Sequence, residues 1–249
     1  MLVRESILNE TYESYSELKK LTDDIFVNLI KNSKYKIDKF YNINEFVNIE
    51  DYKILRDFIN AGVGLILIEK EKNDPNGSYY DKSLYHSQNE PEKLYDLFPL
   101  GFIVIYFTEK YLTEKTYLTG DFKAFHEHEI NEIKNTMIHE LQHAFDDYRS
   151  KGKYSPSNEI LASYKTDGKW IPKKYFRTNH ELSAYFVSII DNIKFFDDNN
   201  KIKDFNTIRV SFSNMAFGMW GFLTPKIQKM YMRKLSQYYY KIKEQHEKE

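Results

Sequence analysis

Apolar residues recur along much of the chain at steps of three and four residues, which is the spacing of one face of an α-helix. The clearest case is the segment 15–32, where Leu18, Leu21, Ile25 and Leu29 alternate with lysine and aspartate. The segments with this spacing are residues 15–32, 49–60, 182–193, 205–220 and 225–243. The pattern predicts helices near both ends of the chain and a mostly helical second half.

Two short runs of apolar and β-branched residues, 63–69 and 101–107, predict buried strands. Residues 35–43 alternate weakly between apolar and polar positions, as a half-buried strand does. The connection between the two buried strands is long and polar and contains the turn sequence Asp-Pro-Asn-Gly at 74–77. A connection of this length is typical of a lid or binding loop, and a surface insertion without a role is the alternative.

A further helix is predicted from Asp121, a candidate N-cap after Gly120, to about Tyr148. Its apolar positions are Ile130, Ile133, Met137, Ile138, Leu141, Ala144 and Phe145. Residues 151–174 contain Gly, Pro, Ser and Asn in no regular order and predict a loop. This central helix carries the most informative polar residues of the chain.

Composition excludes several classes of protein. The 249 residues include 36 basic and 37 acidic side chains, so the chain lacks the strongly basic character of most nucleic-acid-binding proteins. There is no cysteine, which excludes disulfides, cysteine-ligated zinc and a cysteine nucleophile. No apolar segment approaches membrane-spanning length, and acidic residues interrupt the amino terminus where a signal peptide would be apolar. We therefore expect a cytoplasmic protein that partners neither nucleic acid nor membrane, with release or export without a signal as alternatives.

His139 and His143 are four positions apart in the sequence His139-Glu140-Leu141-Gln142-His143, so a helix places both imidazoles on one face. Two imidazoles at this spacing can bind one zinc ion at about 2 Å each. Glu140 lies about 100° further around the helix, outside the coordination shell but near its open position. A carboxylate there can take a proton from water that the metal activates. The motif predicts one Zn²⁺ ion, with His139 and His143 as ligands and Glu140 as the catalytic base.

A catalytic zinc site normally has a third protein ligand, and Glu181 at the start of the next predicted helix is the favoured candidate. Ala184 follows three positions later, and a small residue there lets this helix approach the motif helix closely. His180 opens the same helix and is the first alternative. Asp167, in the predicted loop, is the second.

These motifs resemble the gluzincin group of zinc metallopeptidases, in which His-Glu-x-x-His on one helix is completed by Glu-x-x-Ala on a later helix. The resemblance covers about residues 102–193. It implies that His139, His143 and Glu181 are metal ligands and that Glu140 is the general base.

The resemblance also implies a zincin-like α+β fold, with a small mixed sheet before the motif helix and a mostly α-helical C-terminal half. We expect a single domain over residues 1–249, with a helical and strand-containing part at 1–60 and a helical subdomain at 195–249. In the gluzincin group, an edge strand along the cleft pairs with an extended substrate peptide. Residues 101–107 are the candidate by position, and a plain core strand is the alternative because both faces of this segment are apolar.

Other classes of zinc enzyme fit the sequence less well. A metzincin would have glycine and histidine where Asp146 and Arg149 stand. Peptide deformylases and zinc nucleobase deaminases take cysteine ligands, and this chain has no cysteine. The resemblance to gluzincins implies a hydrolase, a zinc metalloendopeptidase that acts on a peptide or protein. The alternative is a metal-stabilised, zincin-like binding or structural protein without turnover, against which the intact Glu140 argues.

Residues around the motifs suggest supporting roles. Tyr185, with Tyr175 and Arg177 as alternatives, is the candidate that stabilises the oxyanion of the reacting carbonyl. Asp146 or Asp147, one turn past the second motif histidine, would accept the other ring proton of that histidine. The alternative is that both aspartates belong to a solvated end of the helix.

Overall fold

The structure is a computed structural model that describes residues 2–32, 39–69, 77–81, 96–107, 127–151, 179–198, 205–206 and 220–246. Its principal elements, in chain order, are α1 (Leu2–Lys31), β1 (Tyr41–Asn42), η1 (Ile43–Phe46), η2 (Ile49–Asp51), α2 (Arg56–Ala61), β2 (Val63–Glu69), β3 (Gly77–Asp81), β4 (Gly101–Phe107), α5 (Glu127–Ser150), α8 (Asn179–Asp198) and α11 (Pro225–His246). The described chain is therefore a mixed α+β fold with mostly helical content and a small sheet before α5, and this coarse prediction is confirmed.

The described strands form one mixed sheet in the order β1-β2-β4-β3. β2 and β4 run parallel, with Val63 opposite Gly101, while β1 and β3 are antiparallel to their neighbours. β4 is therefore a central strand, so the prediction that residues 101–107 form the edge strand is wrong and the core-strand alternative is right. Both faces of β4 are apolar because both are buried: Ile103 and Ile105 join the main core, while Phe102 and Val104 belong to a second cluster.

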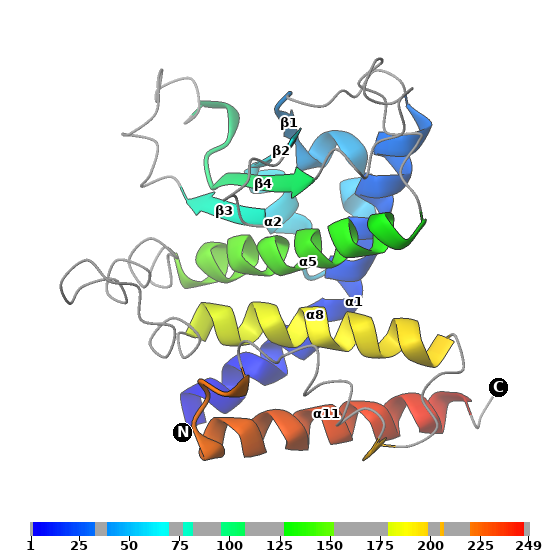
Figure 1. The fold of residues 1–249 in the computed structure, drawn as a ribbon. Helices are drawn as coiled ribbons and strands as arrows, with labels where there is room; N and C mark the ends of the chain where they lie inside the picture. The colour runs from blue at the N-terminus through cyan, green and yellow to red at the C-terminus, as the bar shows by residue number, and fades with distance from the viewer. Residues whose placement is uncertain are drawn as a thin grey trace.

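The long helices form layers on one side of the sheet. In Figure 1 the sheet lies above α5. Helices α8 and α11 follow in turn below α5, and α1 passes behind α5 and α8. α5 contacts β3 and β4 on one side and α8 on the other, and α1 contacts both α5 and α8. α5, which carries the histidine motif, is thus enclosed between the sheet and the other helices.

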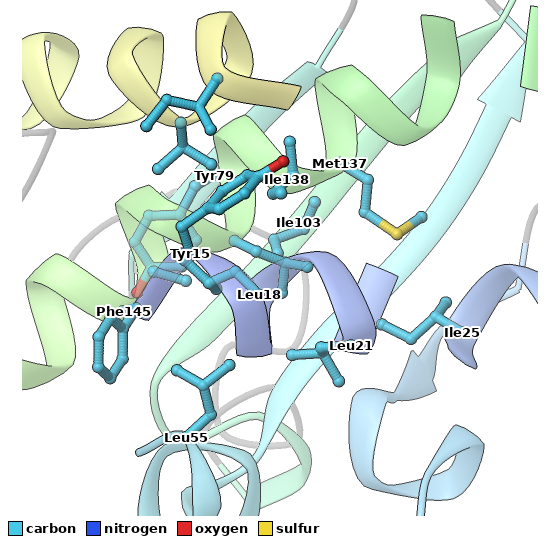
Figure 2. Close-up of a cluster of buried hydrophobic side chains, with 14 of the residues drawn as sticks. Tyr15, Leu18, Leu21, Ile25, Leu55, Tyr79, Ile103, Met137, Ile138 and Phe145 are labelled. Carbon is cyan, nitrogen blue, oxygen red and sulfur yellow. The ribbon is translucent and has the colours of Figure 1, made fainter. Parts of the chain in front are cut away.

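The main core joins α1, the sheet and α5, as Figure 2 shows. Leu18 and Leu21 of α1 are fully buried in one cluster with Ile103 of β4 and with Met137 and Ile138 of α5. At roughly 25 cal/mol per Å² of buried apolar surface, a cluster of this kind is the main term that fixes α5 against the sheet.

The segment 15–32 is helical as predicted, but α1 begins at Leu2. Residues 2–14 contain neither glycine nor proline, so no residue there interrupts a helix that the buried face of α1 has already nucleated.

The prediction of a continuous helix over residues 49–60 is wrong in its first half, because α2 begins only at Arg56. The carboxylate of Glu17 on α1 accepts hydrogen bonds from the backbone N–H groups of Lys53, Ile54 and Leu55. The chain therefore bends there and α2 starts later than its apolar spacing suggests.

The remaining predictions differ in outcome. β2 and β4 lie where they were predicted, as do α8 and α11 and the described part of α5. Residues 35–38 of the weak strand predicted at 35–43 lie outside the described residues, and the described remainder contains β1. The long connection after β2 contains β3, which was not predicted. Gly120, Asp121 and residues 70–76, 82–95, 152–178 and 207–219 lie outside the described residues, and with them the lid hypothesis.

Candidate metal centre

Helix α5 carries the histidine motif in its second half. Ile138, Leu141 and Phe145 are buried in the main core and fix the rotation of the helix. Glu140 and His143 are also buried, and His139 is largely so. A carboxylate and two imidazoles in such a place need polar or metal partners, because burial of unpaired polar groups is costly.

Glu181, in the first turn of α8, lies beside the two motif histidines. The Nε2 atoms of His139 and His143 are 3.1 Å apart. The carboxylate oxygens of Glu181 lie 3.8 Å from Nε2 of His139 and 3.6 Å from Nε2 of His143. These three side chains offer ligand atoms that all lie within 4.8 Å of one another. We refer to them as the His/His/Glu group.

The donor atoms of the His/His/Glu group fit a metal ion with the size and ligand preference of zinc. A hydrogen bond between the imidazoles accounts for the shortest distance, but the two contacts of the carboxylate are longer than hydrogen bonds. Ligands at about 2.0–2.1 Å from a tetrahedral zinc ion lie about 3.3–3.4 Å apart, close to the three spacings observed. Two imidazole nitrogens and one carboxylate also leave a fourth coordination position for water.

Glu140 lies next to the His/His/Glu group without belonging to it. A Cβ atom added to Gly77 of β3 would lie 3.1 Å from Cγ and 3.2 Å from Oε1 of Glu140. The same atom would lie 2.5 Å from Cγ2 of Thr136, one helical turn earlier. The missing side chain of Gly77 therefore makes room for the Glu140 carboxylate between α5 and β3.

Tyr185, one turn after Glu181, packs its ring edge-to-face against His139 at a centroid distance of 4.7 Å. Burial raises the pKa of the Tyr185 phenol, and the negative charges of Glu181 and Glu140 raise it further. The hydroxyl consequently keeps its proton at neutral pH and remains a hydrogen-bond donor. Tyr175 and Arg177, the alternatives for this role, lie outside the described residues.

Helix α11 supports the turn of α8 that carries Glu181. Tyr231 is fully buried, and its hydroxyl donates a hydrogen bond to the carbonyl of Leu182, the residue after Glu181. Burial raises the pKa of this phenol well above its usual value, and Glu181 and Tyr185 raise it further. The phenol therefore keeps its proton at neutral pH, and with it the hydrogen bond to Leu182.

Two aspartates after the motif tie α5 to its neighbours. The Ser183 hydroxyl of α8 donates to the carboxylate of Asp146, which also accepts a bond of 2.8 Å from Nε2 of Gln142. The Tyr79 hydroxyl of β3 donates to the carboxylate of Asp147 at 3.0 Å, in a buried position. The alternative of a solvated acidic helix end is therefore wrong, because these carboxylates hold α8 and β3 in place.

Two residues of the site were not anticipated from the sequence. Ser188 places its Oγ 3.4 Å from Nδ1 of His139, and Gly77 adjoins Glu140. Ser188 lies seven positions after Glu181 and three after Tyr185, on the same face of α8, so extending the helical spacing from Glu181 would have identified it. Gly77 has no comparable signal, because its role depends on the packing of β3 against α5.

The alternatives for the third ligand are not placed by the structure. The backbone of His180 belongs to α8, but its side chain lies outside the described part, and so does Asp167. The role of Glu181 as a ligand stays a prediction, which its distances to both imidazoles support.

Comparison with protein-family models, with curated proteins and with solved structures gave no match. The geometry of the His/His/Glu group and of its surroundings is therefore the observation that bears on function. Of the helices within the described ranges, none combines the length and apolar character that crossing a membrane requires.

Proposed function

We propose that the protein is a zinc-dependent metallopeptidase of the gluzincin type, with His139, His143 and Glu181 as ligands of one Zn²⁺ ion. The observation that carries the proposal is the approach of the Glu181 carboxylate to both imidazoles, at 3.8 and 3.6 Å. Helical spacing alone brings the two histidines together, whereas Glu181 reaches them only because α8 packs along α5. The zincin-like character of the fold belongs to the same proposal.

Each residue around the ion has a distinct part in the proposed reaction. A bound zinc ion supplies a Lewis acid that activates water and polarises the scissile carbonyl. Glu140 accepts the proton of the attacking water and passes it to the leaving amine. Its burial against Gly77 holds the carboxylate inside the site. Tyr185 keeps its own proton and donates a hydrogen bond to the oxyanion that forms on the carbonyl.

The proposed substrate is a peptide or protein segment in extended form. β3 is an edge strand of the described sheet, and it begins at Gly77 beside Glu140. A peptide that paired with this edge would carry its backbone past the catalytic carboxylate. The role first assigned to residues 101–107 thus passes to β3.

The proposal is tested by zinc content and peptide hydrolysis in the same preparations. Wild-type protein purified without added metal is expected to hold about one zinc ion per chain by inductively coupled plasma mass spectrometry, and Glu181→Ala to lose it. Glu140→Gln keeps the shape and the ligands but removes the base, so zinc should remain while turnover of a mixed peptide library falls by about 10²–10⁴-fold.

Exposed Glu50 provides a matched control, because Glu50→Gln makes the same chemical change far along the chain from the motif. It should retain both zinc and turnover. Full hydrolysis by Glu140→Gln would exclude Glu140 as the base. Zinc binding without any hydrolysis by the wild type would favour the metal-stabilised binding or structural protein. A wild type that stays metal-free even with added zinc would remove the proposed site.

A further inference from the structure

Helix α8 presents three side chains to the His/His/Glu group from one face, at positions 181, 185 and 188. Glu181 supplies the carboxylate, and Tyr185 packs its ring against His139. Ser188 lies on the other ring nitrogen of His139, with 3.4 Å between Oγ and Nδ1. The proposed function gives Ser188 no part, although its hydroxyl contacts Nδ1 of this ligand.

The other hydrogen bond of the Ser188 hydroxyl determines whether Ser188 or His139 is the donor in this contact. Ser188 Oγ lies 3.2 Å from the backbone carbonyl of Ala184, one turn earlier in α8, and donates its proton there. A hydroxyl has only one proton, so toward His139 the Ser188 oxygen offers its lone pairs. Nδ1 of His139 must then carry the proton of the neutral ring.

A proton on Nδ1 leaves Nε2 of neutral His139 with a lone pair. Nε2 is the atom that faces Nε2 of His143 at 3.1 Å and the Glu181 carboxylate at 3.8 Å. The lone pair therefore points at the place where the three donor atoms converge. This is the tautomer that a metal-ligating imidazole needs, and a partner on its other nitrogen is the usual way of fixing it.

We infer that Ser188 is a positioning residue that holds His139 in the Nδ1-protonated tautomer: its oxygen accepts a hydrogen bond from the Nδ1–H group, while its own hydroxyl proton is donated to the Ala184 carbonyl. The inference rests on the proposed zinc site. The two hydrogen bonds connect His139 of α5 to the carbonyl of Ala184, which lies in the turn of α8 that follows Glu181. Both ligands are thereby oriented by one short stretch of helix.

The test is the zinc affinity of Ser188→Ala, measured by competition against a chromophoric chelator. Loss of an outer partner of a ligand histidine typically weakens metal binding by about 10–100-fold, and that is the loss expected. Ser188→Thr keeps the hydroxyl, which in a helix can make the same bond to the carbonyl four residues earlier. It should restore affinity to within about threefold of the wild type.

Ser183→Ala is the matched control, because Ser183 is a buried serine of the same helix that bonds to Asp146. It should lower the stability to urea by loosening the packing of α8, and it should weaken zinc binding less than Ser188→Ala does. The visible spectrum of the Co²⁺-substituted protein is expected to change in Ser188→Ala and to return in Ser188→Thr, which a general loosening of α8 would not produce.

Two results would overturn the inference and leave the proposed function standing. One is wild-type zinc affinity in Ser188→Ala, or a loss no greater than in Ser183→Ala. The other is an Nε2-protonated His139 in the metal-free wild type, read from long-range ¹⁵N–¹H correlations. A wild type that binds no zinc in the same competition assay would instead remove the proposed function, and the inference with it.

Discussion

At the residue scale, the site depends on one position that has no side chain. Gly77 begins β3, and a Cβ atom there would come within 2.5 Å of Cγ2 of Thr136 and 3.1 Å of Cγ of Glu140. Real Cβ atoms do not come within 2.5 Å of a methyl carbon, so any other residue must displace either the strand or the Thr136 side chain, and it would also crowd the side chain of Glu140. The close approach of α5 and β3 is therefore what requires glycine in the described structure.

Gly77→Ala is therefore expected to lower the free energy of unfolding by about 1–3 kcal/mol, the usual cost of overpacking, and to reduce peptide turnover more than zinc affinity. Urea denaturation and the competition assay measure the two effects. Thr136→Ser removes the clashing methyl group and should recover part of the stability in the double variant.

Gly221→Ala is the control, since a Cβ atom at Gly221 meets nothing within 4 Å. This substitution should change the free energy of unfolding by less than about 0.5 kcal/mol. A neutral Gly77→Ala would contradict the close packing.

At the element scale, the strands of strongly apolar character were predictable and β3 was not. β2 and β4 are apolar on both faces because they lie in the middle of the sheet. β3 has glycine, serine and aspartate beside two tyrosines, and only its pairing with β4 makes it a strand. The pattern of apolar residues along a segment indicates how deeply the segment is buried. An edge strand is buried too little to show such a pattern.

Tyr79 is the side chain that fixes β3 to α5. Its hydroxyl lies 3.0 Å from the Asp147 carboxylate and 2.8 Å from the carbonyl of Leu100. Tyr79→Phe leaves the ring in the core but removes a hydrogen bond from a buried carboxylate, so stability should fall by about 1–3 kcal/mol. A double-mutant cycle with Asp147→Asn, followed by urea denaturation, should give a coupling energy of about 0.5–3 kcal/mol. Strict additivity of the two changes would mean that this contact does not hold β3.

At the scale of the whole molecule, buried tyrosines join elements that are distant in sequence. Tyr15 of α1 donates to Asp191 of α8 at 3.0 Å, and Tyr52 donates to Asp24 at 2.7 Å. Burial, followed by the neighbouring carboxylates, raises the pKa of both phenols. In the part of the chain that the structure describes, four phenols have raised pKa values, those of Tyr15, Tyr52, Tyr185 and Tyr231.

These shifts predict loss of stability in alkali. Below about pH 10, the ordinary pKa of tyrosine, both the folded and the unfolded chain keep these protons and the contribution is fully present. As the pH rises from there toward the raised pKa of the folded state, the unfolded chain releases protons that the fold retains. Stability then falls by up to about 1.4 kcal/mol per pH unit for each tyrosine. Urea denaturation between pH 8 and about 11 measures the slope.

Tyr15→Phe should be less stable than wild type at neutral pH, because the bond to Asp191 is lost, yet should show a shallower decline above about pH 10. Tyr240→Phe, which removes an exposed tyrosine, is the control. Equal slopes in the two variants would contradict a raised pKa at Tyr15.

The sequence by itself determined the local part of this protein: the helices with a strong apolar face, the two central strands, and the placing of His139 and His143 on one helical face. Those features follow from spacing along a single element, which is written in consecutive residues. Tertiary structure alone decided that β3 exists, that β4 is central, and that Gly77 and Ser188 adjoin the site. It also brought Glu181, already favoured by its spacing to Ala184, to 3.6 and 3.8 Å from the imidazoles. Such contacts join residues far apart in the chain, and they form only when buried surfaces fix one element against another.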